Sequence, residues 1–102
     1  MMPLFQLSTR FYDKEIEIIK KALTELENQC MIDSGFTLGE PFTKAGWTFF
    51  NLQITEKMAL TIEKSGMMEG ALGYGISEQL KNFLGHFLES KGSQISITQI
   101  DY

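Results

Sequence analysis

The sequence predicts an α+β domain, a two-layer sandwich in which two helices cover one face of an antiparallel sheet of about four strands. Hydrophobic residues alternate with a period of two in several short runs, as strands require. In two longer segments they recur every three to four residues, as amphipathic helices require. The length of 102 residues fits one domain, residues 1–102, with a core of its own.

The stretch Trp47–Lys64 predicts a β-hairpin at the centre of the sheet. Residues 47–54 alternate in pattern, and a polar break at 55–56 follows them. Residues 57–63 then carry an apolar face and a polar face, as a half-buried antiparallel strand does. The apolar face of this second strand holds Met58, Leu60 and Ile62.

Further elements flank the hairpin on both sides. The most regular is a helix over Tyr12–Cys30, whose apolar residues are spaced three and four apart. A second helix is expected to begin near Ser77 as its N-cap and to end at Lys91 and Gly92. Three strands complete the pattern: Leu4–Thr9, a short one over Phe36–Leu38, and Ser93–Ile100.

The order strand, helix, strand, strand, helix, strand is that of the ferredoxin-like βαββαβ arrangement. Right-handed crossovers would then place both helices on the same face of the sheet. The alternative is an α+β sandwich of different strand order, in which Phe36–Leu38 is a fifth strand.

This arrangement makes Trp47 and Phe49 candidates for an interface. If the helices cover the face that holds Phe50 and Leu52, the alternation puts both aromatics on the opposite face. An exposed apolar patch of this kind marks a protein–protein contact or self-association. The alternative is that the 35–46 segment or the carboxy-terminal strand covers them.

A glycine-rich stretch, residues 65–76, precedes the second helix and is the candidate ligand loop. Backbone N–H groups at a helix start can hold an anion, although neither the phosphate-loop nor the dinucleotide-binding spacing is present. Met67 and Met68 are expected to be adaptable contacts. A flexible connection is the competing interpretation. The candidate residues are Gly70, Gly73, Tyr74, Gly75 and Ser77.

Composition restricts the class of partner. Thirteen acidic residues against nine basic ones give a net charge of -4, which disfavours nucleic-acid binding. One cysteine leaves no intramolecular disulfide, and no stretch predicts a signal peptide or a membrane span. A soluble, acidic, cytoplasmic protein without a membrane or nucleic-acid partner is the expectation.

The residues that could carry chemistry are few. His86 is the one histidine and is expected to lie on a solvated helix face beside Glu89. Cys30 ends an apolar stripe, where cysteine behaves as a small hydrophobe. Asp13, Glu15 and Glu17 are interpreted as helix-start charges on a solvated face. The sequence predicts no catalytic set, no metal site and no cofactor.

Three functions of different kinds remain. The first is a small non-enzymatic interaction protein that acts by protein–protein contact, as an inhibitor, an immunity-type factor or an assembly factor. The second is a ligand-sensing regulatory module that uses the loop 66–77. The third is a small enzyme of unknown reaction built on Cys30, His86 or Tyr74.

Overall fold

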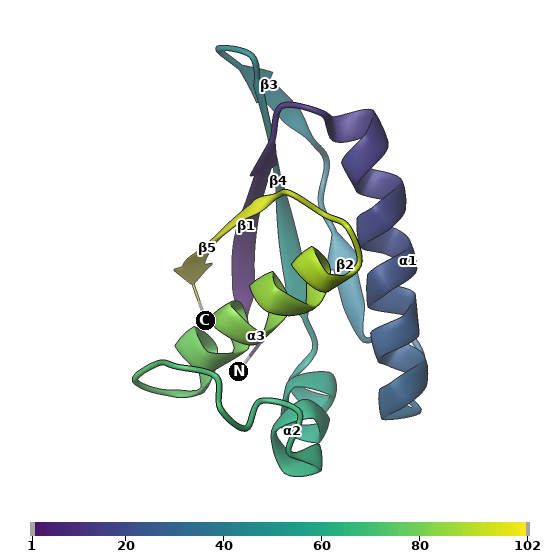
Figure 1. Ribbon diagram of the computed structural model, residues 1–102, viewed down its shortest axis with the longest axis vertical. Coiled ribbons are helices and arrows are strands. Elements are labelled where there is room, and N and C mark those ends of the chain that lie inside the picture. The colour runs from purple at the N-terminus through teal and green to yellow at the C-terminus, as the bar shows by residue number, and fades with distance from the viewer. Residues whose placement is uncertain (1, 102) are drawn as a thin grey trace.

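The computed structural model describes residues 2–101, which form a five-stranded sheet and three helices (Figure 1). The class predicted from the sequence, α+β with an antiparallel sheet, is confirmed. The elements in chain order are β1 (Leu4–Thr9), α1 (Tyr12–Cys30), β2 (Phe36–Leu38), β3 (Phe42–Lys44), β4 (Trp47–Ile54), α2 (Glu56–Ser65), α3 (Ile76–Ser90) and β5 (Ser96–Asp101).

The sheet is built around β1 and β4. Its order is β2-β4-β1-β5, and β3 pairs with β4 farther along the same edge as β2. All of these pairs are antiparallel, and β1 and β4 are in register with Phe5 opposite Leu52 and Leu7 opposite Phe50. These four side chains are buried beneath the helices, so the period-two pattern of both strands corresponds to a covered face and an open face.

The predicted second strand of the central hairpin, residues 57–63, is wrong: this segment belongs to α2. Met58 and Ile62 suit one face of a strand or one face of a helix equally well, so their spacing alone does not decide. The ends decide it. The Thr55 side chain accepts a hydrogen bond from the Met58 N–H (3.2 Å), and Gly66 ends the helix with a φ of 83°.

The hairpin that does form joins β3 to β4 through Ala45 and Gly46. Both residues have positive φ, 54° and 83°, as a two-residue type I′ turn requires. Upstream, residues 39–41 stand opposite only residues 50–51, which makes a bulge that separates β2 from β3. The β3 strand was not predicted because its single alternation, in three residues beside Pro41, is too short to be distinctive.

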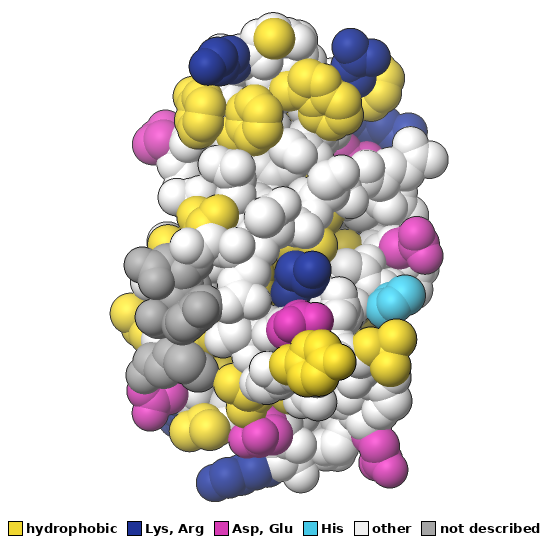
Figure 2. Space-filling model, turned by 90° about the vertical axis from the view of Figure 1, so that its left-hand side faces the viewer, with side chains coloured by type: hydrophobic (Ala, Val, Ile, Leu, Met, Phe, Trp, Pro, Cys, Tyr) yellow, Lys and Arg dark blue, Asp and Glu magenta, His cyan; other side chains and the backbone are white. Residues whose placement is uncertain are grey.

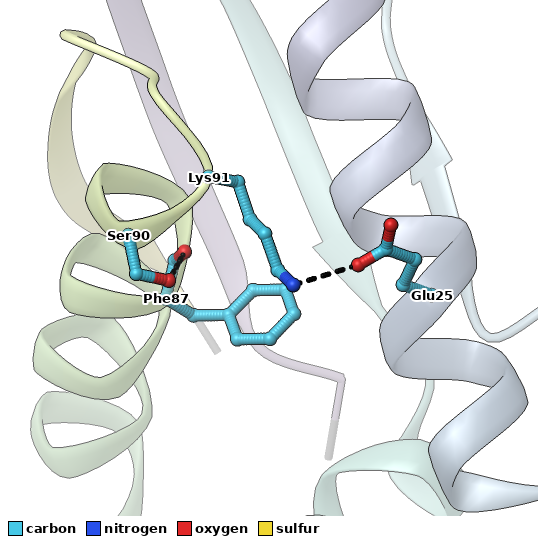
Figure 3. A network of polar contacts seen from close by, with 4 residues as sticks. All are labelled: Glu25, Phe87, Ser90 and Lys91. Carbon is cyan, nitrogen blue, oxygen red and sulfur yellow. Dashed lines mark hydrogen bonds and ion pairs between the residues drawn. The ribbon is translucent and has the colours of Figure 1, made fainter.

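The helices form the second layer. In Figure 1, α1 and α3 lie on one face of the sheet, while α2 lies at the end opposite β3. Three helices are present where two were predicted, because α2 replaces the expected strand. At the C-terminal end of α3, Lys91 contacts α1: its Nζ lies 2.8 Å from a Glu25 oxygen and 5.4 Å from the Phe87 ring (Figure 3).

The α3 helix begins two residues earlier than predicted, and Ser77 is not its N-cap. Gly75 occupies that position, with a φ of 124° and no side-chain cap. The last strand also differs from its expected range, because β5 begins at Ser96 and the preceding Ser93 is buried in a turn.

Candidate interaction surface

Three aromatic side chains gather at the end of the sheet that carries the β3–β4 turn. The Phe42 and Phe49 rings stack with centroids 5.3 Å apart, and Trp47 precedes Phe49 by two residues on the same face of β4. Phe42 is 55% exposed and Trp47 38% exposed, whereas Phe49 is half-buried. We call Phe42, Trp47 and Phe49 the aromatic end.

Cations surround this aromatic end. The Arg10 guanidinium lies 5.2 Å from the centroid of the Trp47 ring, and Lys44 is directly opposite Trp47 in the β3–β4 pair. Figure 2 shows the same arrangement as a band of hydrophobic side chains with Lys or Arg on either side, at the top of the view. An aromatic face attracts a nearby cation through its quadrupole, so Arg10 also orients the Trp47 ring.

A depression of about 620 Å³ lies beside the aromatic end, between the start of α1 and β3. Its wall includes Phe42 from the hairpin, Phe11 from the residue before α1, and the charged residues Arg10, Asp13 and Lys14. Phe11 is itself exposed. Two cations and one carboxylate leave this depression net positive in a chain whose net charge is -4.

Of the two interface candidates found in the sequence, Trp47 lies exposed on the open face and Phe49 lies half-buried beside it. The 35–46 segment does not fold over them; it contributes Phe42 alongside them in the sheet. Sequence reasoning missed Phe42 and Arg10. A possible signal for Phe42 was its position three residues before the Ala45–Gly46 turn, which places it opposite Phe49 once the turn is recognised.

The candidate ligand loop lies elsewhere, before α3. Tyr74 is fully exposed and Leu72 is 81% exposed, while Met68 is buried in the core and Met67 packs against it. The two methionines are therefore not the adaptable contacts expected of them. Gly70, Gly73 and Gly75 all have positive φ, and Ser77 is half-buried in the first turn of α3.

Glu15 differs from its sequence interpretation as a solvated helix-start charge. It is 2% exposed and accepts hydrogen bonds from the Ser93 hydroxyl (2.5 Å) and the Gln94 N–H (3.1 Å). These bonds connect the first turn of α1 to the turn between α3 and β5. A buried carboxylate needs such partners, and here both of its oxygens contact Gln94.

The remaining candidate residues for chemistry, Cys30 and His86, lie on different helices, α1 and α3. Cys30 is buried, and burial raises the pKa of its thiol, which disfavours the reactive thiolate. His86 is exposed on α3. Among the described residues, no group of three or more His, Cys, Asp or Glu side chains is placed to hold a metal ion.

Comparison with protein-family models, with curated proteins and with solved structures found no match. Within residues 2–101, no helix has the length and apolar character needed to cross a membrane.

Proposed function

We propose that this chain is a small non-enzymatic interaction protein, acting as an inhibitor, an immunity-type factor or an assembly factor, and that its partner is a protein that docks on the aromatic end. One observation carries the proposal: Phe42, Trp47 and Phe49 are held together on an open sheet face, two of them substantially exposed. Aromatic side chains clustered in this way are typical anchors of protein interfaces.

Charge supports one kind of partner. Arg10, Lys14 and Lys44 stand around the aromatic end, and Asp13 is the carboxylate in the wall of the depression. The complementary surface is acidic and carries an apolar side chain that reaches the rings. Such a partner would associate faster at low salt, because long-range attraction between opposite charges is screened by ions.

The experiment compares the immobilised wild type with Trp47→Glu and a matched control, Tyr74→Glu, in extract from the source cells. Both substitutions replace an exposed aromatic residue with the same charge. The expected result is a protein retained by the wild type and by Tyr74→Glu but lost with Trp47→Glu. That protein, once purified, should bind the wild type in calorimetry with an affinity that falls as salt rises. Equal retention by all three chains would refute the proposal.

A second function is supported by the exposure of Leu72 and Tyr74, which suits a ligand-sensing loop. A thermal-shift screen with nucleotides and amino acids tests it, because a ligand at 100 times its Kd stabilises the native state by about 2.7 kcal/mol. A ligand that shifts the melting temperature of the wild type but not of Tyr74→Glu would favour this function.

We also propose that the topology is a ferredoxin-like variant. The support is that β2 and β3 pair with the same edge of β4 and can be counted as one bulged strand, with α2 as an additional helix before α3. The proposed location is the cytoplasm, and the buried free thiol of Cys30 is consistent with a reducing compartment.

A further inference from the structure

The strand β5 forms one edge of the sheet. It pairs with β1 on one side, and no strand among residues 2–101 pairs with its other side. In an antiparallel strand, every second residue directs its N–H and C=O groups away from the paired neighbour. An edge of this kind is a template for another strand unless the protein protects it.

The opposite edge is interrupted at its middle, whereas β5 is interrupted only near its C-terminal end. On the opposite edge, the bulge at 39–41 divides the edge into two three-residue strands, and Pro41 has no N–H to donate. In contrast, β5 is a six-residue strand that contains no proline, glycine or lysine. Its one register irregularity lies near its C-terminal end, between the pairs Phe5–Gln99 and Leu4–Asp101, so residues 96–99 pair with β1 without interruption. It is also rich in β-branched residues, which favour strand pairing.

The strand is complementary to itself. Residues 96–100 are uncharged, so pairing with a second copy places no like charges opposite each other. An antiparallel pair centred on Thr98 would put Thr98 opposite its equivalent and Ser96 opposite Ile100. All three of these side chains are exposed in the single chain.

The side of α3 that lies beside β5 is also complementary to itself about a two-fold axis. Lys81 and Glu89 lie four residues before and four residues after Gly85, and all three line one depression together with Ile95 and Ile97. A Cβ on Gly85 would lie 3.4 Å from the Ile97 side chain, so Gly85 is above the middle of β5. A two-fold axis there would bring Lys81 of one copy near Glu89 of the other. Figure 2 looks onto this side of the molecule.

We propose that the chain forms a two-fold dimer in which β5 pairs antiparallel with β5 of a second copy, with the axis near Thr98 and Gly85. The sheet becomes continuous across both copies. Because β5 reverses direction across the axis, the two aromatic ends point to opposite ends of the dimer. Each dimer therefore presents two separate docking surfaces.

The first test is sedimentation equilibrium on the purified full chain at physiological salt, across protein concentrations. The wild type is expected to be a dimer of twice the chain mass. Thr98→Lys places two like charges opposite each other on the axis and should weaken the dimer by about 100-fold or more. Thr37→Lys, an equally exposed substitution on β2, is the matched control and should remain dimeric.

The second test uses charge exchange on α3. Lys81→Glu alone and Glu89→Lys alone should each weaken the dimer, because each puts like charges across the axis. The double variant Lys81→Glu with Glu89→Lys should restore it. Mere unfolding cannot produce this rescue, so the result separates the interface from stability.

Two results would overturn the proposal. One is a wild type that stays monomeric at about 100 µM, where even weak dimers are populated. The other is a dimer that withstands Thr98→Lys but dissociates with Trp47→Glu, which would place the contact on the aromatic end. The first of these results would leave the proposed docking of a different protein on the aromatic end unaffected.

Discussion

The aromatic end and the glycine loop, residues 66–75, both expose large hydrophobic side chains, but they are supported differently. In the aromatic end, Phe42 stacks on Phe49 and Arg10 lies over Trp47, and the pairing of β3 with β4 holds the backbones of the three aromatic residues. In the loop, Tyr74 is fully exposed. A preorganised surface loses less entropy on binding, so the aromatic end is the better docking site.

The contrast extends to the backbone. The Ala45–Gly46 turn is two residues long and closed by paired strands, whereas the loop runs for ten residues between two helices. The Asn82 side chain does hold the loop, by donating to the Leu72 carbonyl (2.5 Å). Exposure alone therefore does not identify a binding site. The contacts that hold the exposed side chains in place matter as much.

The largest expected effect is a loss of stability on substituting a glycine of the loop, and it tests whether the loop is ordered in solution. A Cβ at Gly73 (φ 150°) would lie 2.8 Å from the Gln79 nitrogen, whereas one at Gly70 (φ 91°) would meet nothing within 4 Å. Gly73→Ala should therefore lower the free energy of unfolding by about 2–4 kcal/mol and Gly70→Ala by about 1 kcal/mol. Urea denaturation measures both. Equal losses would mean that the loop does not keep this conformation, and would widen the contrast with the aromatic end.

The next effect compares the buried hydrogen bonds of Glu15, at the start of α1, with the exposed hydrogen bond of Asn82 to the loop. Glu15→Ala leaves the buried Ser93 hydroxyl and the part-buried Gln94 N–H without their acceptor, so a loss of about 2–3 kcal/mol is expected. Asn82→Ala removes a solvent-exposed bond and should cost about 0.5–1 kcal/mol. Thermal and urea unfolding of the two variants measure the difference. Similar costs would show that the buried hydrogen bonds of Glu15 stabilise the fold no more than the exposed bond that holds the loop.

A smaller effect concerns the aromatic end itself. Arg10→Ala removes the guanidinium from the Trp47 ring and should cost about 0.5–1 kcal/mol, while Lys14→Ala should stay within about 0.5 kcal/mol of the wild type. Trp47 is the one tryptophan of the chain, so its fluorescence reports on this surface. Acrylamide should quench it more strongly in Arg10→Ala than in Lys14→Ala. Identical quenching would show that Arg10 does not cover the ring.

The smallest effect lies away from both regions and serves as a reference. Lys91, which bonds to Glu25 and attracts its charge, lowers the pKa of that carboxyl below its ordinary value. A lowered carboxyl pKa contributes stability above the unfolded-state pKa, and the contribution is lost as pH falls through the lowered value. The difference in stability between the wild type and Lys91→Met should thus be present at neutral pH and vanish in acid. If the stability difference persists in acid, its cause is the packing of Lys91 on Phe87 and not the ion pair with Glu25.

Local patterns were enough to predict the elements whose periodicity suits one structure only. The ranges Leu4–Thr9 and Tyr12–Cys30 are confirmed, because a long stripe at helical spacing and a clean alternation each suit one structure only. In residues 57–63, by contrast, the spacing of the apolar residues suited both a strand and a helix. The predicted strand was wrong because the cap at Thr55 and the glycine at 66 favour a helix over the alternation.

The sequence by itself determined the α+β class, the two faces of β4 and thus the side of the sheet on which Trp47 lies. Only the tertiary structure decided that Phe42 joins Phe49, that Arg10 covers Trp47, and that Glu15 is buried. The physical reason is that periodicity is a property of one segment and reports which face a residue occupies. Which residues from distant segments share that face depends on strand register, and the register here follows from a bulge and a two-residue turn.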